Sequence, residues 1–254
     1  MDLGLAGRVY VVSGGSRGLG RATAEVLVAE GARVVVGARD DATVERTAQA
    51  LGGRAHAVGV VADLGLATSA GRLVEAAHSA YGGLDGVLVN VGGPPPGSAL
   101  DSDEDAWRAA FDSVFLGPLR LARRAAAALG AEGGSIAFVL SSSVREPIPD
   151  LAISNGLRPA LAGVAKTLAA ELGPRGIRVN GLLPGRIGTD RSREIDAASG
   201  DADAARTARE ATVPLRRDGD PAEFARVAAF VLSPAASYVT GAMIPVDGGA
   251  LRAI

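Results

Sequence analysis

Residues Arg8–Gly20, with the sequence RVYVVSGGSRGLG, decide the fold. The run Val9–Val12 is short and almost wholly apolar, which is typical of a strand buried on both faces of a sheet. It leads into Gly14, Gly18 and Gly20, spaced as G-x-x-x-G-x-G, and an Ala-rich helical pattern follows. Glycines permit a tight turn and a close approach to a pyrophosphate, and the N–H groups of a helix N-terminus attract its charge. The stretch therefore predicts a strand, a dinucleotide-binding turn and a helix.

Beyond this stretch, short β-branched runs alternate with Ala-rich amphipathic segments along the chain. The predicted strands are Arg8–Ser13, Arg33–Ala38, Ala55–Val61, Gly86–Asn90, Ser135–Ser141, Arg178–Leu183 and Met243–Val246. The predicted helices are Gly20–Glu30, Val44–Leu51, Thr68–Tyr81, Ser102–Leu129, Asn155–Leu172 and Pro221–Leu232. Such alternation predicts an α/β fold, a single-domain doubly wound parallel sheet (Rossmann fold) over residues 1–254 with helices on both faces. The polar, weakly patterned segment 190–217 is predicted to be a substrate lid.

Composition limits the classes of function. The chain has 254 residues and a net charge of −2, which gives no electrostatic reason to expect a nucleic acid or an anionic membrane as partner. The absence of Cys excludes a disulfide scaffold, a thiolate metal site and a cysteine nucleophile. His56 and His78 are too few for a zinc cluster, so we expect no metal. Neither a signal peptide nor an uninterrupted apolar span is recognisable, and we therefore expect a cytoplasmic protein that acts on a small molecule.

Residues at the ends of the first four predicted strands are candidates for a cofactor site. They are Gly14, Ser16, Arg17, Gly18, Leu19, Gly20, Arg39, Asp63, Leu64, Asn90 and Gly92. NAD sites tend to carry an acidic residue after the second strand to bind the ribose 2′-hydroxyl, whereas this chain has Arg39 there and Arg17 in the glycine turn. Two guanidinium groups suit a 2′-phosphate, so we expect NADP rather than NAD. The alternative is that Arg39 is a solvated surface residue.

These residues and several later motifs resemble the classical short-chain dehydrogenase/reductase family, and its 3-oxoacyl-acyl-carrier-protein reductase branch in particular. The shared motifs cover nearly the whole chain and are Gly14–Gly20, Asp63, Asn90–Gly93, Gly134-Ser135-Ile136, Asn180, Pro184-Gly185, Thr189, Thr240-Gly241 and Val246–Gly249. The resemblance implies a Rossmann subunit that binds NAD(P)H and assembles as a homotetramer, and it implies that Ile187 and Thr189 meet the nicotinamide carboxamide. Small residues in two predicted helices, Ser102–Leu129 and Asn155–Leu172, would permit close helix pairing between subunits.

The chain departs from the family at the catalytic positions, which the family fills with Asn, Ser, Tyr and Lys. Matching by spacing puts these, in that order, at Val114, Ser141, Ser154 and Arg158, so only the Ser is retained. The single lysine, Lys166, lies two helical turns beyond the expected position, and the three Tyr residues fall in other segments. The local sequence, in which Asn155 follows Ser154, resembles an atypical subgroup with S-N-x-x-R in place of Y-x-x-x-K.

The replacements limit the chemistry. An aliphatic hydroxyl such as that of Ser154 is a poor general acid because its pKa lies far above the phenol value of about 10. Arg158 stays charged and cannot relay protons, but it can stabilise an oxyanion or hold the nicotinamide ribose. We take Ser141, Ser154, Asn155 and Arg158 as the candidate catalytic residues. The alternatives are a plain strand-end hydroxyl for Ser141, a helix N-cap for Ser154 and a surface ion pair for Arg158.

Three functions remain open from the sequence. The first is an NADPH-dependent carbonyl reductase, acting on a ketone or a 3-oxoacyl-like substrate, with a non-standard proton donor. The second is a non-redox enzyme on the same fold, such as an isomerase, a dehydratase or a cyclase. The third is an NADP-binding subunit without catalysis. Arg186, in the loop after a predicted strand, is an expected contact for an anionic substrate.

Overall fold

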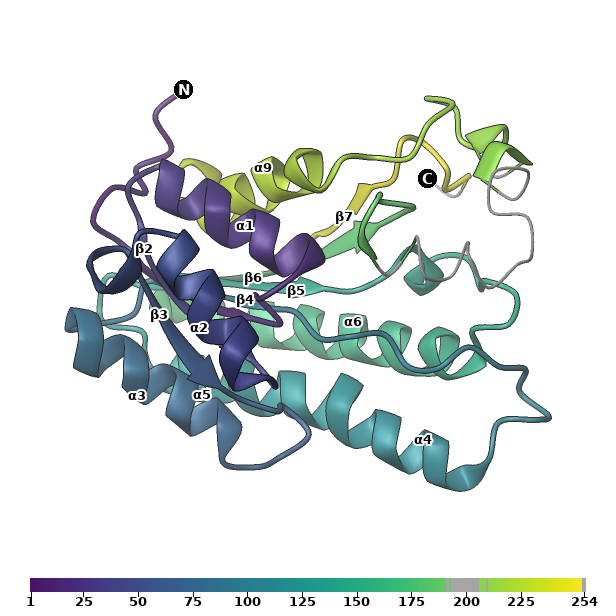
Figure 1. Ribbon diagram of the computed structural model, residues 1–254, viewed down its shortest axis with the longest axis horizontal. Helices are drawn as coiled ribbons and strands as arrows, with labels where there is room; N and C mark the ends of the chain where they lie inside the picture. Colours follow the sequence, from purple (N-terminus) through teal and green to yellow (C-terminus); the bar gives the residue numbers. More distant parts are fainter. Residues whose placement is uncertain (191, 193–205, 209, 253–254) are drawn as a thin grey trace.

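A computed structural model describes residues 1–190, 192, 206–208 and 210–252. Within them the strands are β1 (Val9–Ser13), β2 (Arg33–Ala38), β3 (Ala57–Val61), β4 (Gly86–Val89), β5 (Gly134–Val139), β6 (Ile177–Pro184) and β7 (Met243–Val246). They form one seven-stranded sheet in the order β3-β2-β1-β4-β5-β6-β7, and every neighbouring pair is parallel. This confirms the predicted Rossmann-like α/β fold (Figure 1).

Helices cover both faces of this sheet. They are α1 (Gly18–Ala29), α2 (Asp41–Ala50), α3 (Ser69–Tyr81), α4 (Glu104–Ala110), α5 (Gly117–Ala128), α6 (Ala152–Leu172) and α9 (Pro221–Leu232). In β1, Val9 and Val11 pack with α3, α5 and α6, whereas Tyr10 and Val12 pack with α1, α2 and α9. Figure 1 shows these two helical layers above and below the sheet. Because both faces are buried, the central strands carry apolar residues at nearly every position.

The sheet has a topological switch point at β1. The chain continues from β1 outward through β2 and β3, and then returns to place β4 on the other side of β1. The helices that follow β1 and β4 in the chain, α1 and α5, cover opposite faces of the sheet, which leaves a crevice beyond the carboxyl ends of β1 and β4. Ligands of open α/β sheets bind in such a crevice, so the fold puts Gly14 and Asn90 at the expected location.

The predicted helix Ser102–Leu129 is not a uniform α-helix. It begins at Glu104, with the side chain of Asp103 accepting a hydrogen bond from the N–H of Ala106, and residues Phe111–Leu116 form a π-helical turn between α4 and α5. Pro118 accounts for the change, because it has no N–H and its ring would clash with the carbonyl four residues earlier in a regular α-helix. The π turn contains Val114, the position that spacing matches to the Asn of the family that the sequence resembles, and π turns are frequent at functional sites.

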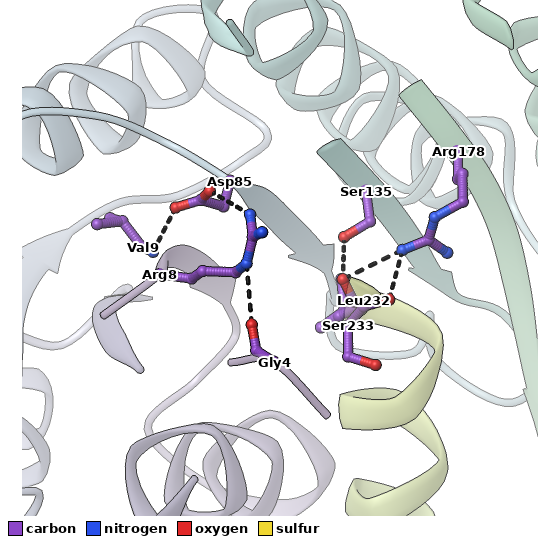
Figure 2. Close-up of polar contacts among 8 residues, drawn as sticks. All are labelled: Gly4, Arg8, Val9, Asp85, Ser135, Arg178, Leu232 and Ser233. Carbon is purple, nitrogen blue, oxygen red and sulfur yellow. Dashed lines mark hydrogen bonds and ion pairs between the residues drawn. The ribbon is translucent and has the colours of Figure 1, made fainter. Parts of the chain in front are cut away.

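Arginines hold the edge of the sheet at which the strands begin (Figure 2). Arg178, in β6, donates to the carbonyls of Leu232 (3.3 Å) and Ser233 (2.8 Å) at the C-terminal end of α9. Arg8 pairs with Asp85 at 2.8 Å and so joins the starts of β1 and β4. A cation is favourable at a helix C-terminus because the last carbonyls carry partial negative charge. The polar groups of this edge are thus engaged in structural contacts, far from the carboxyl ends of the strands.

Most of the predicted lid, 190–217, lies outside the described residues, so that prediction stays untested. The chain on either side of it meets in a short parallel bridge, in which the N–H of Gly188 donates to the carbonyl of Gly219 at 2.8 Å. Val213, near the end of the segment, is buried against Gly248. Among the described helices, none combines the length and the apolar character that a membrane crossing requires.

Candidate active site

The glycine turn is shaped by contacts that exclude side chains. Gly14 and Gly18 have φ values of +57° and +54°, the left-handed region that favours glycine. A Cβ on Gly20 would lie 2.2 Å from the carbonyl oxygen of Gly14, so α1 can pack this closely only with glycine there. The side chain of Asn90 donates to the same Gly14 carbonyl at 3.1 Å and ties the turn to the end of β4. Asn90, predicted to bind the cofactor, therefore uses its amide to hold the turn.

The N-terminus of α1 opens beside two arginines. Its N-cap, Arg17, provides no side-chain hydrogen bond to the first turn, and that turn contains no acidic residue. The first amides of a helix lack partners within the helix, so they are available to an anion. Arg17 and Arg39 are both exposed, and Arg39 forms no hydrogen bond or ion pair with any described residue. The turn therefore combines free amides with positive charge.

The remaining cofactor candidates lie along the same edge of the sheet. The carboxylate of Asp63 accepts the N–H of Gly65 at 2.9 Å, and Leu64 is buried. Thr189 lies against the glycine turn, since a Cβ on Gly18 would be 3.5 Å from its methyl carbon, and Ile187 is buried among the core residues next to α9. By contrast, a Cβ on Gly92 would have no protein atom within 4 Å. The edge of the sheet at which the strands end thus carries several small or polar residues, and the space beside Gly92 is not filled by protein atoms.

Arg158 is the most unusual residue at this edge. It lies on α6 with 5% of its surface exposed, and its Nη1 donates to the carbonyl of Val139, the last residue of β5, at 2.7 Å. That is its one hydrogen bond within the described residues, and it has no ion pair there. Desolvation by burial lowers the pKa of the guanidinium to about 10, so it remains a cation at neutral pH. The predicted alternative, a surface ion pair, is therefore wrong.

Three serine hydroxyls gather around the start of α6. Ser154 is the third residue of this helix, which begins at Ala152 rather than at the predicted Asn155, so the N-cap interpretation of Ser154 is wrong. Its Oγ is buried and lies 3.5 Å from the Oγ of Ser143. Ser141 caps the 3₁₀ turn Ser142–Val144, because its Oγ accepts the N–H of Ser143 at 3.1 Å. Ser143 was missed by sequence reasoning, although the run of three serines after β5 was a signal for it.

Asn155 faces away from these hydroxyls. Its Oδ1 accepts the N–H of Ile148 (3.0 Å) and its Nδ2 donates to the Ile148 carbonyl (2.8 Å). These two hydrogen bonds to the backbone of one residue fix the loop between β5 and α6. The loop walls a hollow of about 390 Å³, lined by Gly97, Ser98, Ala99, Pro147, Ile148, Pro149, Asp150, Ala152 and Asn155. Asn155 therefore holds the wall of this hollow, and its catalytic role stays a prediction.

Comparison with known proteins decides the family. The family model described as Enoyl-(Acyl carrier protein) reductase matches residues 14–250. An uncharacterized oxidoreductase of Methylorubrum extorquens is 39% identical over 96% of this chain and 98% of its own length. Dehydrogenase/reductase SDR family member 4 of Homo sapiens is 35% identical over 96% of this chain and 88% of its own length. The chain belongs to the short-chain dehydrogenase/reductase family.

A solved structure shows that the similarity covers the whole chain. L-sorbose reductase from Gluconobacter frateurii, complexed with NADPH and L-sorbose, matches with a TM-score of 0.95 at 29% identity and covers 100% of both chains. The relatives are oxidoreductases of the short-chain family, and this chain is one of them by descent and by fold.

The tyrosines and the lysine of this chain lie away from the positions that spacing matches to the family's catalytic Tyr and Lys. Tyr10 is buried in β1, Tyr81 ends α3, and Tyr238 is exposed after α9. Lys166 is an exposed residue of α6, and its Nζ donates to the carbonyl of Gly241 at 3.1 Å. The only lysine of this short-chain dehydrogenase/reductase therefore supports the turn before β7.

Val114 and Trp107 form an apolar wall behind α6. Val114, matched to the family's Asn, is buried in the π turn and packs with Leu157. Trp107 packs against the same cluster, and a Cβ on Gly156 would lie 3.1 Å from its ring. Trp107 is thus a partly buried residue of this cluster, and its indole contacts α6 at Gly156, two residues before Arg158.

Arg186 has a partner within the protein. Its Nε lies 3.2 Å and 3.3 Å from the two carboxylate oxygens of Asp218, and both side chains are largely buried. The pair joins the loop after β6 to the chain before α9, and the expected contact of Arg186 with an anionic substrate stays a prediction. In the described part of the chain, no group of three or more His, Cys, Asp or Glu residues is placed to hold a metal ion.

Proposed function

We propose that this protein is an NADPH-dependent carbonyl reductase with a non-standard proton donor. The observation that carries the proposal is that a buried guanidinium and three hydroxyls lie at the same sheet edge as a glycine turn flanked by Arg17 and Arg39. The similarity to a reductase complexed with NADPH supports this choice of cofactor. Ketones and 3-oxoacyl groups are the substrates that the family relationship favours.

The residues present fit a nicotinamide dinucleotide. Its diphosphate would be held by the amides at the start of α1, in the turn that contains Gly14, Ser16, Gly18, Leu19 and Gly20. The 2′-phosphate would be held by Arg17 and Arg39, the adenine by Asp63 and Leu64, a ribose at Asn90 and Gly92, and the carboxamide at Ile187 and Thr189. When bound, this cofactor supplies a hydride.

The chain's own residues would stabilise the oxygen of the carbonyl. As negative charge develops there, the Arg158 cation attracts it, and the hydroxyls of Ser141 and Ser154 donate hydrogen bonds. Neither serine is acidic enough to protonate an alkoxide efficiently, so the proton comes from water or from a hydroxyl of the substrate. General acid catalysis contributes about 10²–10⁴-fold, and positioning contributes separately, so a slow reductase is compatible with the loss of the phenol.

Calorimetry with both cofactors tests the cofactor assignment. We expect NADPH to bind more tightly than NADH, and we expect Arg39→Asp to remove the preference. Arg124→Asp makes the same charge change on the exposed face of α5, across the sheet, and should leave both affinities unchanged. Equal affinities of the parent protein for NADPH and NADH would refute the assignment.

Steady-state oxidation of NADPH with ketones, 3-oxoacyl thioesters and quinones tests the chemistry. Arg158→Met should lose about 2–4 kcal/mol of transition-state stabilisation, the range for one oxyanion donor, and Arg158→Lys should keep part of the activity. Ser154→Ala should lose less, about 1 kcal/mol. The double variant Ser154→Tyr with Arg158→Lys rebuilds the family's usual pair and should raise activity on simple ketones. If Arg158→Met and Ser154→Ala both match the parent, the non-redox and non-catalytic functions replace this proposal.

We also propose a homotetramer. Phe111, with 42% of its surface exposed, stacks on Phe115 with ring centroids 5.1 Å apart, on the outer side of the π turn. Two stacked aromatic rings on the surface of a helix that is rich in small residues are suited to pack against a helix of a second subunit. Light scattering at micromolar concentration should give four times the chain mass, and a monomer mass would contradict the proposal.

A further inference from the structure

Arg158 is a buried cation whose charge the described residues leave uncompensated. No described carboxylate pairs with it, and desolvation is the sole cause of its lowered pKa, with no contribution from a neighbouring charge. Keeping an ion out of water without a partner is costly, and buried charges are ordinarily paired or bound to a ligand. The position therefore requires a source of negative charge.

The donors of Arg158 remain available to such a source. Nη1 is bonded to Val139, whereas Nε and Nη2 have no partner among the described residues. Among these residues the only fully buried side-chain nitrogen or oxygen without a hydrogen bond is Oδ1 of Asp218, so Nε and Nη2 are not sealed and reach accessible space. A guanidinium presents these two groups in one plane, which matches two oxygens of a planar anion.

The cofactor does not account for this charge. Its phosphates fit the glycine turn after β1 and the arginines beside it, whereas Arg158 lies beyond β4, at the end of β5. The part of a nicotinamide dinucleotide that approaches this position in the proposed binding mode is a neutral ribose. The anion is therefore expected on the second ligand.

We propose that Arg158 is a recognition site for a substrate that already carries a planar oxyanion, such as a carboxylate or a phenolate. This inference rests on the proposed function only in placing the substrate beside Arg158. Ser143 and Ser154, whose hydroxyl oxygens are 3.5 Å apart and buried, supply neutral donors near the same position. A neutral ketone would leave the guanidinium as uncompensated as it is in the protein alone.

Trp107 provides a direct readout of binding. It is the only tryptophan, and its ring packs on Gly156, between Ser154 and Arg158. Benzoate and benzamide are planar and nearly isosteric but differ in charge, and titration of each against Trp107 fluorescence gives two dissociation constants. We expect the dissociation constant of benzoate to be at least about tenfold lower than that of benzamide, because hydrogen bonds between two charged groups are stronger than those to a neutral group. Similar constants for the two would overturn the proposal.

A second arm distinguishes a carboxylate from a phenolate. The absorbance of 4-nitrophenolate reports its own binding, and calorimetry with neutral 4-nitroanisole provides the comparison. A charge preference in either arm supports a planar oxyanion, and its relative size in the two arms tells which kind the site favours.

Two methionine substitutions on α6 provide the test and its control. Arg158→Met should abolish the preference for benzoate while leaving the weak benzamide binding unchanged, and Arg158→Lys should retain part of the preference. Lys166→Met removes an exposed cation from the same helix and should preserve the preference. Circular dichroism and NADPH binding show whether each variant is folded. Loss of the preference in Lys166→Met, or its survival in a folded Arg158→Met, would refute the assignment of the site.

The two proposals fail in distinguishable ways. If NADPH binds but benzoate and benzamide are bound equally, the reductase proposal stands and the anion site is refuted. If NADPH does not bind, the reductase proposal is refuted, while the benzoate titration of the protein alone still tests the anion site.

Discussion

Replacing Arg158 with methionine should stabilise the protein in the absence of ligands, although it should impair the site. Burial lowers the pKa of the guanidinium to about 10, and this shift corresponds to about 3 kcal/mol of desolvation at about 1.4 kcal/mol per pH unit. The substitution removes the 2.7 Å bond to Val139 and leaves that carbonyl without this donor, which costs about 1–2 kcal/mol. Methionine is flexible enough to fill the space of the buried stem. The balance is a gain of about 1–2 kcal/mol in the free energy of unfolding.

Thermal unfolding followed by circular dichroism measures this gain. For a chain of this length each kcal/mol changes Tm by about 2–4 °C, so Tm should rise by about 2–8 °C. Lys166→Met is the control, because it removes an exposed cation of the same helix and should not raise Tm. A Tm of Arg158→Met below that of the parent would show that the guanidinium contributes net stability, and the argument for an uncompensated charge would then be wrong.

Three further substitutions test other parts of the structure. Gly92→Ala should leave Tm unchanged, because the added methyl meets no protein atom, but it should weaken NADPH binding on the order of tenfold in calorimetry. Asp220→Ala removes the capping box that Asp220 forms with Glu223 at the start of α9, and urea unfolding should show a loss of about 1 kcal/mol. Asn155→Ala frees the backbone of Ile148, so steady-state kinetics should show KM raised several-fold with a smaller effect on kcat.

The features that follow from local chain chemistry were predictable from the sequence. The glycine turn is an example, because Gly14 and Gly18 adopt positive φ and Gly20 meets backbone within a few residues. The strands could be placed to within one or two residues because both faces are apolar. The start of β3 was misplaced by two residues, since Gly53–Ala55 form a 3₁₀ turn that follows Gly52 at a φ of +100°.

The features that depend on contacts between distant segments were not predictable. Nothing in the S-N-x-x-R pattern shows that Asn155 binds the backbone of Ile148, or that Ser154 approaches Ser143. The burial of Arg158 depends on how α6 packs on β5, and the spacing of residues along the sequence carries no information on that packing. The π turn was missed for a different reason, because the effect of Pro118 lies one turn before it in an otherwise regular pattern.

The hydrogen bond between Gly188 and Gly219 closes the base of the loop that runs between them. The two ends are held side by side by the bridge that starts at Ile187, whatever lies between them. The entropy of closing a loop grows only logarithmically, about 0.6 kcal/mol for each doubling of length. A change in the length of this loop that spares Thr189, Val213 and Asp218, whose contacts lie outside it, should therefore cost little stability. Relatives can differ in loop length at this place while the sheet and the glycine turn after β1 keep their form.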